Sequence, residues 1–171
     1  ITDVDKEHWL DEDSSRLEKT TVFEGLKGKE KISYVLGDYD EGEPNEITIY
    51  EYQDDQKGEK ALRETRTYNI DGVSKEGWLE DDKDRLKSIS VYSGEAGKER
   101  IEYTLYDYED GIPRSRMDYI YDEDSKGDKK NLDYTGLYDI SGLSDEEKET
   151  KGKGVLQEET KYSGSAAHEK I

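Results

Sequence analysis

Cysteine is absent from this chain of 171 residues. Its absence excludes disulfides, thiolate metal sites and cysteine nucleophiles together. Proline and histidine each occur only twice. No apolar run approaches the roughly 18 residues that a transmembrane helix needs. The sequence therefore predicts no membrane insertion.

Apolar residues are also scarce. Hydrophobic residues make up 30% of the chain, charged residues make up 42%, and the formal net charge is -19. Such a composition is typical of disordered proteins, which cannot bury enough apolar surface to fold. The chain nevertheless has 14 tyrosines and two tryptophans, whereas disordered segments are poor in aromatic residues. We therefore expect a folded protein with a thin core, in which tyrosine supplies much of the buried area.

Basic residues are outnumbered, with 26 lysines and arginines against 45 acidic residues. Nucleic acid is bound by clustered lysines and arginines, and no such cluster appears in the sequence. An anionic membrane surface would repel the chain for the same reason. The charge balance thus predicts no nucleic-acid partner and leaves cations and neutral polymers open.

Catalytic motifs are missing as well. No glycine-rich phosphate loop, nucleophile elbow or zinc-ligand spacing occurs. Acidic residues are spread along the chain, whereas catalysis needs groups that converge on one site. The sequence predicts a protein that is not an enzyme and has no catalytic or cofactor-binding residues.

The main feature of the sequence is an internal repeat. When residues 9–61 are compared with residues 78–130, 23 of 53 positions are identical. One inserted residue then lengthens the spacing from 69 to 70, and a third copy begins near residue 143. The identities include the only tryptophans and the only prolines, which pair as Trp9 with Trp78 and Pro44 with Pro113. This self-similarity predicts tandem units of about 70 residues.

We divide the chain into a first unit over 1–72, a second over 73–142 and a partial third over 143–171. The first unit starts in the middle of the repeat pattern. Both ends of the chain fall inside a unit, whereas self-contained arrays usually end in capping units. The pattern predicts a segment of a longer polypeptide in which neighbouring units pack on one another.

Each unit contains four segments with strand-like alternation of apolar and polar residues. Short connections between them indicate an antiparallel meander. We therefore predict an all-β, elongated repeat array with one packed face and one wet face. The predicted strands are 17–24, 30–39, 47–52 and 62–70, with counterparts at 86–93, 99–108, 116–121 and 132–140.

Details of the unit are predicted from local chemistry. Ile32, Tyr34 and Leu36 are expected to share one face by simple alternation. The run 41–44 is expected to be a turn, because it combines glycine with proline. The segment 73–86 is either a loop that inserts its tryptophan into the sheet or a short helix. Ser144 and Glu147 have the spacing of a capping box, which predicts a helical turn near 144–150.

The sequence contains candidates for two kinds of binding site. Clustered acids near turn glycines could hold calcium, although their spacing matches neither the EF-hand loop nor the nonapeptide repeat. Tyrosines on the third strand of each unit could bind a glycan or another polymer, or could simply form cross-strand pairs. The calcium candidates are Asp38, Asp40, Asp107, Asp110, Asp122, Asp124 and Asp128. The candidate aromatic face consists of Tyr50, Tyr52, Tyr119 and Tyr121.

The run Tyr-Thr-Leu-Tyr-Asp-Tyr-Glu-Asp-Gly over 103–111, followed by Tyr-Ile-Tyr-Asp over 119–122, resembles the repeats of bacterial Rhs and YD-repeat proteins. That resemblance implies a long, spiralling β-sheet in a large surface or secreted protein. The expected function is then a structural spacer or adhesive segment, located outside the cell or on its surface. The alternatives are a glycan- or protein-binding module and an adhesin repeat made rigid by calcium.

Overall fold

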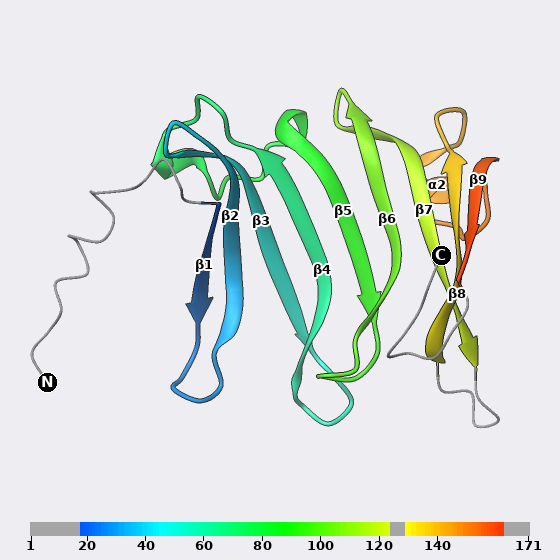
Figure 1. The fold of residues 1–171 in the computed structure, drawn as a ribbon, viewed down its shortest axis with the longest axis horizontal. Coiled ribbons are helices and arrows are strands. Elements are labelled where there is room, and N and C mark those ends of the chain that lie inside the picture. Colours follow the sequence, from blue (N-terminus) through cyan, green and yellow to red (C-terminus); the bar gives the residue numbers. More distant parts are fainter. Residues whose placement is uncertain (1–17, 124–128, 163–171) are drawn as a thin grey trace, which may run out of the picture.

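The computed structural model describes residues 18–123 and 129–162. These residues form one sheet in which every strand pairs antiparallel with the next one along the chain (Figure 1). The predicted all-β antiparallel meander is therefore confirmed, and the sheet is open. Its nine strands are β1 (Lys19–Glu24), β2 (Lys31–Asp40), β3 (Glu43–Asp54), β4 (Lys60–Asn69), β5 (Leu86–Ser93), β6 (Arg100–Glu109), β7 (Ile112–Glu123), β8 (Lys129–Asp139) and β9 (Val155–Lys161).

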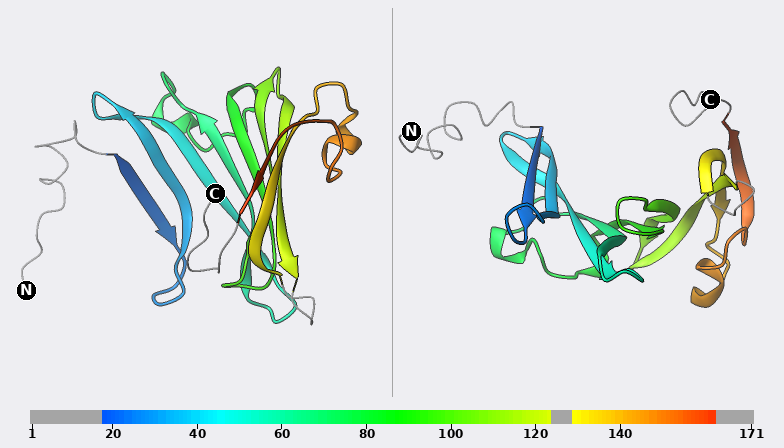
Figure 2. Two further views of the ribbon diagram at one scale, coloured as in Figure 1. Left: turned by 45° about the vertical axis from the view of Figure 1, so that its right-hand side comes forward. Right: turned by 90° about the horizontal axis from the view of Figure 1, so that it is seen from below.

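The sheet is curved, so that one face is concave and the other is convex (Figure 2). Two longer connections lie on the convex side. Residues 70–85 join β4 to β5 and are called the first cap, and residues 140–154 join β8 to β9 and are called the second cap. The two faces of the sheet are therefore distinct, because only the convex face is covered by caps.

The turn between β2 and β3 is shorter than the sequence predicted. It consists of Glu41 and Gly42 alone, with φ of 48° and 87°, and β3 begins at Glu43. Positive φ at both central residues is the pattern of a type I′ hairpin turn, whose twist matches that of the flanking strands. Pro44 thus lies inside β3 and not in a turn. The strand tolerates it because β4 pairs with β3 only from Glu46 onward, so no neighbour on that side needs its missing N–H.

Simple alternation fails at β-bulges. Val22 pairs with Tyr34, but the next residue of β1, Phe23, pairs with Ile32, so Ser33 is an extra residue in β2. Val22 and Phe23 are adjacent in β1 and point to opposite faces, so their partners Tyr34 and Ile32 also point to opposite faces. The prediction that Ile32 shares a face with Tyr34 was therefore wrong.

The main hydrophobic cluster lies on the convex face, beneath the first cap. Trp78 packs against this cluster, and its indole Nε1 donates to the Val73 carbonyl oxygen at 3.0 Å. The cap contains two short 3₁₀ turns, η2 (Lys75–Gly77) and η3 (Lys83–Arg85). Both predicted forms of this segment are seen in part, since it packs its tryptophan on the sheet and also contains short helical turns. The buried members of the cluster are Leu36, Ile47, Tyr68, Ile70 and Leu86.

The second cap carries the predicted helical turn, α2 (Asp145–Lys148). The Ser144 backbone N–H and Oγ both donate to Glu147 Oε2, at 3.2 and 2.9 Å. The bond from the Ser144 N–H belongs to a capping box, in which the Glu147 N–H also donates to the Ser144 side chain. A capping box satisfies donors that the first turn of a helix leaves free. The prediction from the Ser144 and Glu147 spacing is confirmed.

Tyrosine contributes less to the fully buried core than the sequence suggested. Tyr68 is 1% exposed, while the other 13 tyrosines are half-buried. The remaining buried hydrophobic residues are aliphatic, including Ile47 and Ile140 at 0% exposure. No second layer packs on the concave face among the described residues, so its side chains are covered only by neighbouring side chains. Large rings on that face therefore stay partly exposed.

Candidate functional site

The predicted tyrosines lie on the concave face. Tyr50 in β3 pairs with Thr65 in β4. Its side chain points to the face opposite that of Ile47 and Ile49, which face the caps. The register continues through β5 and β6 to β7 and places Tyr119 on the same face. By the same alternation this face holds six tyrosines, which we call the concave aromatic face: Tyr50, Tyr52, Tyr92, Tyr106, Tyr119 and Tyr121.

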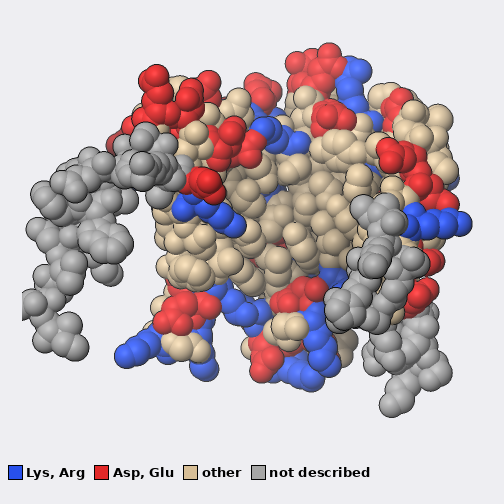
Figure 3. Space-filling view, viewed as in Figure 1, with Lys and Arg blue, Asp and Glu red and all other residues tan. Residues whose placement is uncertain are grey.

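Hydroxyl groups fill the spaces between these rings. Thr48 and Thr67 share a hydrogen bond between their Oγ1 atoms at 3.0 Å, and Ser90 and Thr104 share one at the same distance. Figure 3 looks onto the concave face and shows an uncharged centre, with acidic and basic residues gathered at the two ends of the strands. The face therefore presents rings and hydroxyls in an otherwise highly charged molecule.

A basic side chain lies over two of the six tyrosines of the concave aromatic face. Lys31 Nζ is 5.7 Å from the centroid of the Tyr52 ring, and Arg100 Cζ is 5.4 Å from the centroid of Tyr121. Both distances fall in the range of cation–π contacts. Lys31 and Arg100 occupy equivalent positions of the repeat, so a recurring basic residue was visible in the sequence. A comparison limited to identical residues does not detect it.

Tyr50 and Tyr52 line a recess of about 430 Å³, which we call the tyrosine recess. Burial raises the pKa of Tyr50 above its ordinary value, and the neighbouring Tyr92 adds to the effect. Burial also raises the pKa of Tyr52. The hydroxyls of Tyr50 and Tyr52 are therefore neutral near pH 7, and each can donate as well as accept hydrogen bonds. The other residues of the recess are Glu24, Gly25, Lys29, Lys31 and Lys60.

Three of the seven calcium candidates have an unusual backbone conformation. Asp38, Asp107 and Asp110 have φ of 51°, 55° and 51°, in the left-handed region where aspartate is tolerated better than most residues. Asp40 and Asp122 are exposed on strands, while Asp124 and Asp128 lie outside the described residues. Within the described ranges, no three acidic or histidine side chains are grouped so that they could hold a metal ion.

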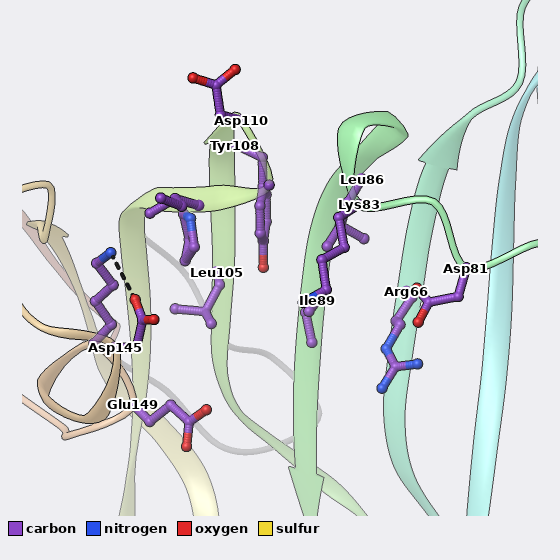
Figure 4. A pocket seen from close by; sticks show the side chains of 14 residues that line it. Arg66, Asp81, Lys83, Leu86, Ile89, Leu105, Tyr108, Asp110, Asp145 and Glu149 are labelled. Atoms are coloured by element: carbon purple, nitrogen blue, oxygen red, sulfur yellow. Dashed lines mark hydrogen bonds and ion pairs between the residues drawn. The ribbon is translucent and has the colours of Figure 1, made fainter.

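A second recess, of about 400 Å³, lies on the convex face between the two caps (Figure 4). We call it the cap recess. Leu86, Ile89 and Leu105 supply apolar side chains, while Arg66 and Glu149 supply charge. Arg66 is already engaged, because its Nη1 lies 3.0 Å from Glu51 Oε1. Charged and apolar side chains therefore line the recess in similar measure, and the sequence alone gave no indication of it.

Tyr108 lines this recess, and its hydroxyl is buried without a hydrogen-bond partner. The equivalent residue in the first unit is Tyr39, whose hydroxyl donates to Thr20 Oγ1 at 2.8 Å. The residue equivalent to Thr20 is Ile89, which cannot accept a hydrogen bond. Burial consequently raises the pKa of Tyr108 well above its ordinary value.

These two tyrosines should respond differently to loss of the hydroxyl. We expect Tyr39→Phe to lower the free energy of unfolding by about 1 kcal/mol, because it breaks a partly buried hydrogen bond. We expect Tyr108→Phe to leave it unchanged or to raise it, because the hydroxyl removed has no partner. Urea denaturation of the two variants measures both effects. Equal losses in the two variants would contradict the difference in hydrogen bonding.

Comparison with family models, with curated proteins and with solved structures found no match for this chain. The helices among the described residues are single turns, and none has the length or apolar character of a membrane span. The functional interpretation therefore depends on the geometry of the sheet and its two faces.

Proposed function

We propose that this chain is a non-enzymatic structural segment, in which tandem units of about 70 residues build one continuous curved sheet. The unit boundaries proposed are those from the sequence, 1–72, 73–142 and 143–171. In such an array each unit buries apolar surface against its neighbours, so length is added without a new fold. A spacer in a surface or secreted protein has this property, and the resemblance to YD-repeat proteins favours the same setting.

The equivalence of backbone features supports the repeat. β2 and β6 begin 69 residues apart, at 31 and 100, and end 69 apart, at 40 and 109. Left-handed residues also recur at this spacing, Asp38 with Asp107 and Glu41 with Asp110. The extra residues of the β-bulges recur at 69 or 70, and they are Ser33 with Glu102, Arg63 with Asp133 and Lys87 with Gln157.

The observation that carries the structural interpretation is that some buried positions change their chemistry while this backbone geometry recurs. Ile47 on the convex face is 0% exposed, and its equivalent, Arg116, is 2% exposed. The position of Trp78 in the first cap corresponds to Lys148 in the second. A ligand site repeated beneath the caps would need the same side chains in both, whereas an architectural unit needs only the same turns and bulges.

Lengthening the chain tests this proposal. A second copy of residues 70–139 inserted after Asp139 keeps the order of cap and strands and adds equivalents of β5 to β8. We expect a single cooperative unfolding transition at an unchanged or higher midpoint, as in repeat arrays. We also expect the sheet to lengthen by about 19 Å along its curve, since neighbouring strands lie roughly 4.8 Å apart. Small-angle scattering and denaturant unfolding measure these two quantities.

A matched control inserts the same 70 residues after Asp110, within the turn between β6 and β7. This insertion separates two strands that pair directly, so we expect loss of stability or a second transition. If the insertion after Asp139 behaved like this control, the units would not be interchangeable and the structural proposal would fail.

A further inference from the structure

Part of the concave aromatic face recurs in both units. Tyr50 and Tyr52 recur as Tyr119 and Tyr121, and the cation over the ring recurs as Lys31 and Arg100. On the convex face the same strands exchange isoleucine for a buried ion pair. A half-exposed ring with an adjacent cation is not required for the hairpin turns or the bulges, so its recurrence favours a role in ligand binding.

The groups around the tyrosine recess match the surface of a sugar. The C–H face of a pyranose ring stacks on an aromatic ring, and its hydroxyls both donate and accept hydrogen bonds. Lys29 and Lys31 offer donors beside Tyr52, and Glu24 offers an acceptor. The hydroxyls of Thr48 and Ser90 extend the polar part of the surface across the concave face.

Charge selects among possible polymers. A polyanion would be repelled by the net charge of -19. A polycation would meet Lys29, Lys31 and Lys60 in the same recess. The centre of the face carries neither sign (Figure 3). A neutral polymer avoids both penalties.

The spacing of the tyrosine pairs favours a polymer over a small sugar. β3 and β7 are four strands apart, which corresponds to roughly 19 Å along the sheet at about 4.8 Å per strand. A chain that runs across the strands, along the concave face, passes both pairs. We propose that the concave aromatic face binds a neutral polysaccharide that lies across the strands and contacts Tyr50 and Tyr52 at one point and Tyr119 and Tyr121 at another.

Affinity electrophoresis tests this proposal with the whole chain. The probes are four neutral polymers, namely dextran, laminarin, yeast mannan and hydroxyethyl cellulose, with heparin as the anionic comparison. We expect at least one neutral polymer to retard the protein and heparin to have a smaller effect. Because two contacts on one polymer reinforce each other, we expect Tyr52→Ala and Tyr121→Ala each to weaken binding about tenfold and together about 100-fold.

Matched variants separate binding from folding. Tyr52→Phe keeps the ring and should retain binding, and Tyr108→Phe on the convex face should not alter it. An NMR titration of the unmodified protein with an oligosaccharide from the bound polymer should shift resonances of β3 and β7 on the concave face, whether or not the alanine variants fold. The proposal is overturned if no neutral polymer binds, if the double alanine variant binds as well as the unmodified chain, or if heparin binds more tightly.

This site goes beyond the structural role, and its failure is distinguishable from failure of that role. The insertion of residues 70–139 reports on the repeat without any ligand. A chain that lengthens as expected but binds no neutral polymer would be a spacer alone.

Discussion

Removal of either partner of the buried Arg116–Asp118 ion pair is expected to be the most damaging single change in the described sheet. Arg116 and Asp118 are 2% and 1% exposed, and Arg116 Nε lies 2.6 Å from Asp118 Oδ1. Arg116 Nη1 also donates to the Lys148 carbonyl oxygen at 2.9 Å, and the Gly152 N–H donates to Asp118 Oδ2 at 2.8 Å. The ion pair therefore fastens the second cap to the strands. Its guanidinium also lies 3.8 Å from the centroid of the Tyr103 ring.

We expect Arg116→Ala or Asp118→Ala to lower the free energy of unfolding by about 3–5 kcal/mol, because each leaves a buried charge without its partner. Urea denaturation followed by circular dichroism measures the loss. The exposed ion pair between Lys57 and Glu95 is the control, and Lys57→Ala should leave the midpoint nearly unchanged. A loss no larger than that of the control would contradict the burial of the ion pair.

The first unit suggests how the loss can be reversed. Its equivalent positions are Ile47 and Ile49, which lie beneath the first cap and cannot form an ion pair with each other. We expect the double variant Arg116→Ile/Asp118→Ile to recover most of the stability lost in either alanine variant, since apolar residues often replace buried ion pairs at little cost. Recovery would show that the two caps sit on equivalent surfaces.

The strands and turns of this fold could be predicted from the sequence because their signals are local. Gly42 permits the positive φ of a tight hairpin turn, and alternating residues mark the strands on either side. The capping box of Ser144 and Glu147 is likewise a short-range pattern that the structure reproduces. Each of these features depends on residues within about one turn of one another.

The faces were harder to predict because they depend on partners distant in sequence. Ser33 and Glu102 are bulge residues, yet nothing in their chemistry distinguishes them from the polar residues around them. Arg116 in a strand would ordinarily be assigned to solvent, and only closure of the second cap buries it. The curvature that makes one face concave is a property of the assembled sheet. Simple alternation does hold within the tyrosine pairs of β3 and β7, since no extra residue interrupts either strand between them.

Glycine at position 94 is expected to be nearly as important to stability as the buried ion pair. Its φ is 116°, and a Cβ atom there would lie 2.6 Å from the Lys98 carbonyl oxygen. The left-handed backbone costs an L residue about 1–3 kcal/mol, and the contact with a backbone atom adds to this cost. We expect Gly94→Ala to lower the free energy of unfolding by about 3 kcal/mol, as measured by urea denaturation.

Its equivalent in the first unit, Gly25, has φ of 112°, and an added Cβ would lie 3.1 Å from the Lys29 carbonyl oxygen. Gly25→Ala should therefore destabilise the chain in the same way but by less, because the neighbouring carbonyl needs to move only slightly. Gly37 is the control, since its φ is ordinary and nothing lies within 4 Å of the position of an added Cβ. Gly37→Ala should be neutral or slightly stabilising, because alanine restricts the unfolded chain more than glycine does. If all three variants unfolded at the same urea concentration, the turns after β1 and β5 would not have the shared left-handed geometry on which the repeated unit depends.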